Sequence, residues 1–174
     1  YNTALGYSAG NLMTTGIHNT FLGASSGRGA VEGDGNTAVG YNAGYALQGA
    51  AASNTIIGTS AGDAMTTTKY TVLIGQAAGG AIDSDDADGS VAVGYAALNA
   101  NTDGISNTAI GWSSLRTNVQ GDFNTAIGYN SLYYYNAESA GEGNNTAIGY
   151  NAGVYVEYGV NNTFIGRSAG ASIT

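Results

Sequence analysis

The chain has 174 residues, no cysteine and no proline, and its four basic residues against twelve acidic ones give a net charge of −8. With so few cations to neutralise phosphates, this composition argues against nucleic-acid binding. No run of 18 apolar residues occurs, so the sequence predicts no membrane-spanning segment.

One nine-residue phrase recurs ten times, and it reads Asn-Thr-Ala-Ile-Gly-Tyr-Asn-Ala-Gly at 145–153. A repeat of this size predicts a stack of similar coils rather than a globule around one core. We therefore expect an all-β fold, a parallel β-solenoid or β-roll of about ten coils of 17 residues, forming one domain over 1–174. The central glycine of the phrase returns every 17 to 21 residues, at Gly6, Gly23, Gly40, Gly58, Gly75, Gly94, Gly111, Gly128, Gly149 and Gly166.

Each phrase predicts a short strand that ends at its central glycine, and positions are numbered here from that glycine. Position −1 is aliphatic in all ten copies, and we interpret it as a buried column inside the coil. Position −2 is apolar as well, and neighbouring strand residues point to opposite faces. We therefore expect the −2 column to pack against a neighbouring chain, so that glutamate at Ala109 and Ala126 would dissociate the assembly.

Position −4 is asparagine in eight copies, with Thr71 and Ser90 in the other two. Stacked asparagine side chains can hydrogen-bond from coil to coil, as in other stacked-strand assemblies. The connectors of roughly eight residues between phrases predict a second short strand and a return turn in each coil. Ten coils at about 4.8 Å each would make a rod roughly 50 Å long.

Two connectors raise the question of whether the chain binds a cofactor or a metal ion. The run at 27–33 has one residue too many for a dinucleotide-binding fingerprint. The connector that follows Ile82 carries Asp83, Asp85, Asp86 and Asp88, and oxygen-rich acidic loops can hold calcium. Their spacing is not that of an EF-hand, so a solvated acidic loop is the alternative interpretation. Apart from this calcium candidate we expect no cofactor.

The longest connector begins with Tyr133, Tyr134 and Tyr135 and adds four residues to a 17-residue coil. Extra residues in a solenoid protrude on one face, often the binding face. We predict a ligand-contact patch here. The alternative is an inert loop that packs on the next coil.

Position +1 is aromatic in six copies, among them Trp112, Tyr129 and Tyr150. A file of exposed rings could stack on sugar rings, or it could pack against neighbouring coils or chains. We count these three with the tyrosines of the long connector as candidate ligand-binding residues. The single histidine, His18, and the absence of cysteine leave no arrangement of nucleophile and base, so we predict that the chain is not an enzyme.

The phrase, with its Val/Ile-Gly ladder and its small residues downstream, as in 90–94, resembles the head domains of trimeric autotransporter adhesins (the YadA-like head) and the repeat region of some phage tail fibres. The resemblance implies a left-handed parallel β-roll in which three chains lie side by side. It also implies an extracellular role in attachment, on a cell surface or a virion surface. The repeats here are longer than those of the adhesin heads, and we expect a fragment of a longer fibrous protein.

Three functions follow from these patterns. The first is a homotrimeric attachment rod that contacts a cell-surface glycan or protein. The second is a purely structural subunit or spacer of an extracellular filament, with subunits stacked end to end. The third is ice binding, because a threonine ladder on a β-solenoid can order water. The threonines at position −3 share a face with the aliphatic −1 column, so we expect them inside the coil, which argues against ice binding.

Overall fold

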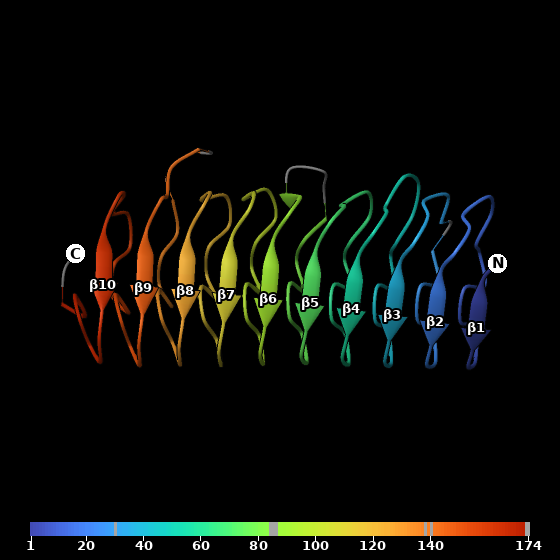
Figure 1. The fold of residues 1–174 in the computed structure, drawn as a ribbon, viewed down its shortest axis with the longest axis horizontal. Coiled ribbons are helices and arrows are strands. Elements are labelled where there is room, and N and C mark those ends of the chain that lie inside the picture. The colour runs from blue at the N-terminus through green and yellow to red at the C-terminus, as the bar shows by residue number, and fades with distance from the viewer. Residues whose placement is uncertain (30, 84–86, 138, 140, 173–174) are drawn as a thin grey trace.

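The computed structural model describes residues 1–29, 31–83, 87–137, 139 and 141–172. It contains ten parallel strands of three residues in a single sheet, which follow one another in chain order along a rod (Figure 1). The β-solenoid expected from the repeat is therefore confirmed. The strands are β1 (Thr3–Leu5), β2 (Thr20–Leu22), β3 (Thr37–Val39), β4 (Thr55–Ile57), β5 (Val72–Ile74), β6 (Val91–Val93), β7 (Thr108–Ile110), β8 (Thr125–Ile127), β9 (Thr146–Ile148) and β10 (Thr163–Ile165).

Equivalent positions of successive phrases pair with one another throughout the sheet. Ala109 of β7 lies opposite Ala126 of β8, and Ala126 lies opposite Ala147 of β9. The register survives the longer coil between β8 and β9. Asn136 still donates its backbone N–H to the equivalent Glu157 carbonyl at 2.9 Å, so the extra residues lie after Asn136.

The second strand expected in each coil was wrong. Among the described residues, the return side consists of turns and two isolated bridges. Positions +2 and +4 take a left-handed backbone, as at Ser113 (φ 51°) and Leu115 (φ 49°), and an extended strand cannot continue through such corners. The backbone still bonds from coil to coil, since the Leu115 N–H donates to the Ser131 carbonyl at 2.9 Å.

The central glycine is required by the approach of successive coils. At Gly149, φ is 136°, and an added Cβ atom would lie 2.6 Å from the carbonyl oxygen of Gly166. Both the backbone conformation and the close contact exclude a side chain there. Gly166 has a similar φ of 121°, but an added Cβ would meet nothing within 4 Å.

The two faces of each strand are the reverse of the prediction. The −2 residues form the core, and Ala109 and Ala126 are fully buried within a single chain. The −1 residues face outward, with Ile110 37% exposed and Ile148 36% exposed. Glutamate at Ala109 and Ala126 would therefore disrupt the coil itself, and the expectation that these alanines hold neighbouring chains together was wrong.

The asparagine at position −4 provides the physical reason for this reversal. Alternation along the strand places it on the same side as position −2. The Nδ2 of Asn107 donates to the Gly121 carbonyl at 2.7 Å, and this carbonyl belongs to the return turns. A buried amide needs such partners, and only the coil interior supplies them. The polar residue at −4 therefore determines which apolar column is inside.

The predicted coil-to-coil asparagine ladder is confirmed. Asn124 donates both its backbone N–H (2.9 Å) and its Nδ2 (3.1 Å) to Oδ1 of Asn107. The ladder also reaches the threonine that replaces asparagine in the fifth copy, since Thr71 Oγ1 donates to Asn54 Oδ1 at 2.9 Å.

The large side chains that fill the thin core come from different positions in different coils. In the second coil Phe21 comes from the strand and position +4 is Gly27, where a Cβ atom would clash with the phenylalanine ring. In the seventh coil the strand supplies Ala109 and position +4 is the buried Leu115. This exchange explains why the three consecutive leucines at +4 occur where the strand carries alanine, since cores are close-packed and tolerate little change in volume.

Positions −3 and −1 together form a continuous surface that we call the outward face. It carries no charged residue, and its threonines point to solvent, so the expectation that they lie inside the coil was wrong. Position −3 also holds Val72 and Val91. The outward face comprises Thr3, Leu5, Thr20, Leu22, Thr37, Val39, Thr55, Ile57, Val72, Ile74, Val91, Val93, Thr108, Ile110, Thr125, Ile127, Thr146, Ile148, Thr163 and Ile165.

Candidate ligand-binding groove

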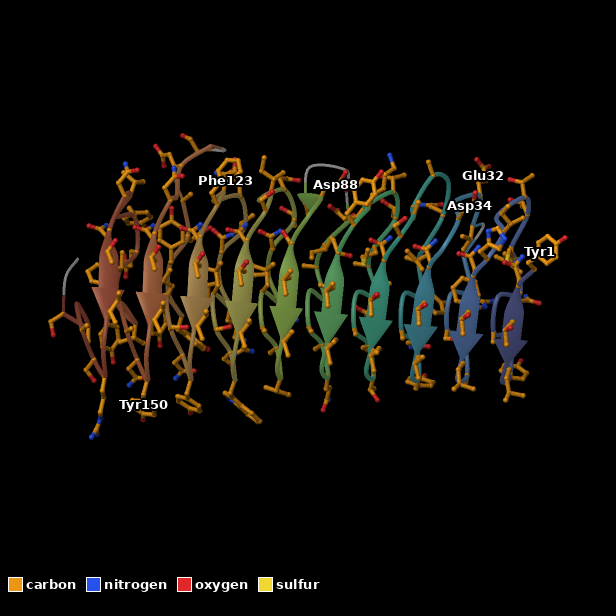
Figure 2. The ribbon with its side chains drawn as sticks, viewed as in Figure 1. Tyr1, Glu32, Asp34, Asp88, Phe123 and Tyr150 are labelled. Atoms are coloured by element: carbon orange, nitrogen blue, oxygen red, sulfur yellow. The ribbon has the colours of Figure 1, made fainter. Side chains whose placement is uncertain are left out.

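The aromatic residues at position +1 follow the carboxyl ends of the strands, at the rim where Tyr150 is labelled in Figure 2. Their rings stack from coil to coil, with 4.2 Å between the ring centroids of Tyr95 and Trp112 and 5.2 Å between those of Tyr129 and Tyr150. Packing against neighbouring coils is thus confirmed. The rings remain open to solvent as well, since Trp112 is 52% exposed and Tyr129 is 44% exposed.

A second aromatic group lies across from this file, at positions +5 and +6. Tyr134 stacks on Tyr155 with 5.5 Å between ring centroids, and it meets Tyr133 edge to face at 4.6 Å. Arg116 donates from Nη1 to the Tyr133 hydroxyl at 2.7 Å and lies over the ring of this residue, 5.7 Å from its centroid. The tyrosine therefore holds the guanidinium in place.

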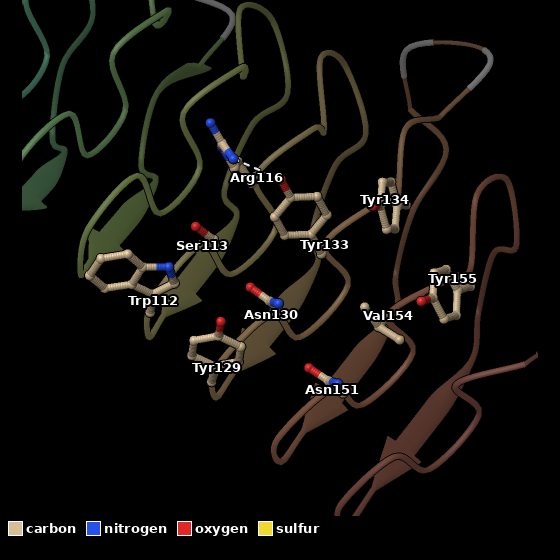
Figure 3. Close-up of a pocket in the computed structure, with 10 residues that line it drawn as sticks. All are labelled: Trp112, Ser113, Arg116, Tyr129, Asn130, Tyr133, Tyr134, Asn151, Val154 and Tyr155. Carbon is tan, nitrogen blue, oxygen red and sulfur yellow. Dashed lines mark hydrogen bonds between the residues drawn. The ribbon is translucent and has the colours of Figure 1, made fainter.

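Between the two aromatic groups lies a hollow of about 320 Å³, which we call the aromatic groove (Figure 3). Its floor consists of position +2 side chains from three successive coils, where serine and asparagine tolerate the left-handed backbone. The groove is lined by Trp112, Ser113, Arg116, Tyr129, Asn130, Tyr133, Tyr134, Asn151, Val154 and Tyr155.

One acceptor on the floor of the groove is unsatisfied. Oδ1 of Asn151 is buried and has no hydrogen-bond partner among the described residues. A buried acceptor without a partner costs about 1–3 kcal/mol.

The structure therefore brings together four of the six aromatic residues chosen from the sequence, namely Trp112, Tyr129, Tyr133 and Tyr134. Tyr150 does not line the groove, but its ring supports Tyr129 from the next coil. The interpretation of the tyrosines as part of an insertion was wrong, because they occupy the regular positions +5 to +7 of their coil.

Tyr135 is fully buried in the core and cannot contact a ligand, so its choice as a binding residue was wrong. It occupies position +7, which also supplies the core residues Leu47, Met65 and Ile82. That apolar column was a signal in the sequence that could have placed it inside. Burial, with a smaller contribution from the charge of Glu142, raises the pKa of Tyr135 to about 12.

Sequence reasoning missed the arginines. Arg116 and Tyr133 occupy position +5 of successive copies, and so do Arg28 and Tyr45. Arg28 donates from Nη1 to the Tyr45 hydroxyl at 2.5 Å and lies 5.4 Å from the ring centroid. This pair borders a hollow of about 270 Å³ whose other lining residues are Leu12, Gly29, Ala46 and Gln48. An arginine followed 17 residues later by a tyrosine was the available signal.

The calcium candidate gains no support from the structure. Asp85 and Asp86 lie outside the described residues. Asp83 is exposed, and Asp88 accepts the backbone N–H of Lys69 on Oδ1 at 2.6 Å. Among the residues that the structure describes, no three acidic or histidine side chains gather in a group that could hold a metal ion.

Comparison with known proteins adds no relative, since neither a protein-family model nor a curated protein nor a solved structure matches the chain. The resemblance to adhesin heads and tail fibres thus stays a prediction. Within the described part of the chain, no helix has the length and apolar character needed to cross a membrane.

Proposed function

We propose that this chain forms an attachment rod in which three copies associate side by side on a cell or virion surface and contact a glycan or protein of a target cell. The observation that carries the proposal is the outward face, which runs along all ten strands without a charged residue in a chain of net charge −8.

The size of the outward face supports association. Ten strands at about 4.8 Å spacing, each about 10 Å long, present a flat surface of roughly 450–500 Å². A patch of this size is at the upper end of what a monomer normally exposes. A closed three-fold arrangement would cover the outward faces of all three chains at once, and closed symmetry is the usual form of homo-oligomers.

The aromatic groove supports the contact function. None of its residues belongs to the outward face, so association through that face leaves the groove uncovered. Three chains would present three copies of the groove. Linked copies strengthen weak individual contacts without any new interaction.

Whole-cell binding, together with arrays of glycans and surface proteins, tests the attachment function. We expect the associated rod to bind at least one target class and to bind more weakly when dilution separates the chains. A folded trimer that binds no cell, glycan or protein would contradict attachment, and it would favour the purely structural filament or spacer.

Ice binding is the second candidate, because the threonine column faces solvent. Eight threonines repeat at the strand spacing of about 4.8 Å on a flat sheet, which is the kind of regular hydroxyl and methyl surface that could order water. Thermal hysteresis measured on the purified chain tests this candidate. A monomer with hysteresis that disappears in Thr108→Glu would favour ice binding over association, and a trimer without hysteresis would remove it.

A further inference from the structure

We propose that the aromatic groove binds a linear acidic oligosaccharide that lies along the rod axis, with the carboxylate of one sugar at Arg116. This inference rests on the proposed attachment function and names the ligand class of the same groove. Its elements are exposed aromatic rings, a polar floor and one fixed cation, and each has a separate role.

The aromatic rings leave half-exposed apolar surface along both sides of the groove, which sugar rings can contact. Trp112, Tyr129 and Tyr134 are each between 44% and 52% exposed, and each stacks on a ring of a neighbouring coil, which holds it in place. Large rigid rings with a polar edge suit contacts that are apolar on one side and wet on the other. Because successive coils are about 4.8 Å apart, close to the length of one sugar ring, the exposed ring edges of successive coils can meet successive sugars.

The polar floor supplies hydrogen bonds to hydroxyl groups. Figure 3 shows the side chains of Asn130 and Asn151 along the floor, between the two aromatic groups. The side chains of Ser113, Asn130 and Asn151 line the groove, and hydroxyl and amide groups can both donate to and accept from sugar hydroxyls. An apolar ligand would cover these polar groups without offering them a hydrogen bond, so the floor favours a hydroxyl-rich ligand.

Charge distinguishes an acidic sugar from a neutral one. Of the described residues that line the groove, only Arg116 is charged. Labelled acidic side chains, Glu32, Asp34 and Asp88, lie at the opposite rim of the sheet, away from the aromatic file (Figure 2). Because Tyr133 holds the guanidinium through one hydrogen bond and the ring face, its remaining N–H groups are positioned for a carboxylate at little entropic cost.

The second arginine–tyrosine pair provides a matched control within the same molecule. Arg28 and Tyr45 reproduce the hydrogen bond and the ring contact of Arg116 and Tyr133. Among the described residues that line their hollow there is no second aromatic ring and no asparagine. It therefore has the cation without the two facing aromatic groups and without the floor of stacked asparagines, and we expect it not to bind.

The experiment is calorimetric titration with tetrasaccharides that contain glucuronic, galacturonic or sialic acid, each compared with its carboxyl-reduced counterpart. At least one acidic tetrasaccharide should bind wild type, and its reduced counterpart should bind about tenfold more weakly. Arg116→Gln should lose the same tenfold for the acidic sugar only, whereas Arg28→Gln should change nothing. Trp112→Ala and Tyr134→Ala should weaken both forms, and circular dichroism verifies that every variant is folded.

The inference is overturned if no acidic tetrasaccharide binds, if the reduced sugars bind as tightly as the acidic ones, or if Arg28→Gln matches Arg116→Gln. The proposed function fails differently, through the absence of any cell, glycan or protein binding. A rod that binds cells equally well with and without Arg116 and Tyr134 would retain the attachment function and lose this inference.

Discussion

The two sides of the strands carry similar side chains and face different surroundings. In β7, Ala109 points inward and is fully buried, whereas Thr108 and Ile110 point outward. Both sides are largely apolar along the whole sheet, so hydrophobicity alone does not tell which side is the core. The asparagine at position −4 determines which side is buried. Asn107 lies on the inward side, where its Nδ2 donates to a carbonyl of the return turns.

The largest expected effect on stability comes from glutamate substitutions at two adjacent residues, one on each side of a strand. The pair tests directly which side is the core. Ala109→Glu places a carboxylate in a core without a cationic partner, which should cost about 4 kcal/mol or more and unfold the middle coils. Ile110→Glu places the same charge on the outward face, so the coil should remain folded while association is lost.

Circular dichroism with temperature and light scattering measure the two properties separately. The order of effects would be contradicted if Ala109→Glu folded normally and only dissociated. It would also be contradicted if Ile110→Glu unfolded the rod as extensively as Ala109→Glu does.

The contact between coils can be separated from backbone strain at the central glycines. Gly149→Ala should destabilise the rod by about 2–4 kcal/mol, because its Cβ would lie 2.6 Å from the Gly166 carbonyl oxygen in addition to the strained φ. Gly166→Ala carries strain without that clash. Thermal unfolding of both variants measures the difference, and equal losses would show that coil contact contributes nothing.

The role of the asparagine ladder can be measured by interrupting it. Asn124→Ala removes the acceptor for the backbone N–H and Nδ2 of Asn145, both at 3.1 Å, and should cost about 1–3 kcal/mol. In Asn162→Ala no later asparagine loses its acceptor, so the loss should be smaller. Chemical denaturation of the pair tests the order, and a larger loss at Asn162 would refute the idea that successive amides depend on one another.

The smallest effect concerns the buried Tyr135. The raised pKa means that the fold favours the neutral phenol, so its contribution to stability is complete below about pH 10 and is lost as the pH rises toward 12. Tyr135→Phe should remove this part of the alkaline destabilisation. The exposed Tyr134→Phe serves as control, and the melting temperature between pH 9 and 12 is the measurement. Identical profiles for the two variants would contradict the assignment.

The sequence predicted the solenoid, its period and the asparagine ladder, because these depend on spacing and on short-range alternation. It predicted the wrong apolar column to be inside, since both columns are apolar and only the amide partner of Asn107 distinguishes them. The groove was predicted in part. Tyr133 and Tyr134 were chosen for a wrong reason, as members of an insertion, while Arg116 was missed because its partner lies one coil away.

The mass of the chain in solution tests the central claim, that the outward face joins copies of the rod, most directly. Sedimentation equilibrium at micromolar concentration should give three times the 17.4 kDa of one chain. The same measurement on Ile110→Glu, folded by circular dichroism, should give the mass of one chain. A wild-type chain that is folded and stays at 17.4 kDa as its concentration rises would contradict the claim.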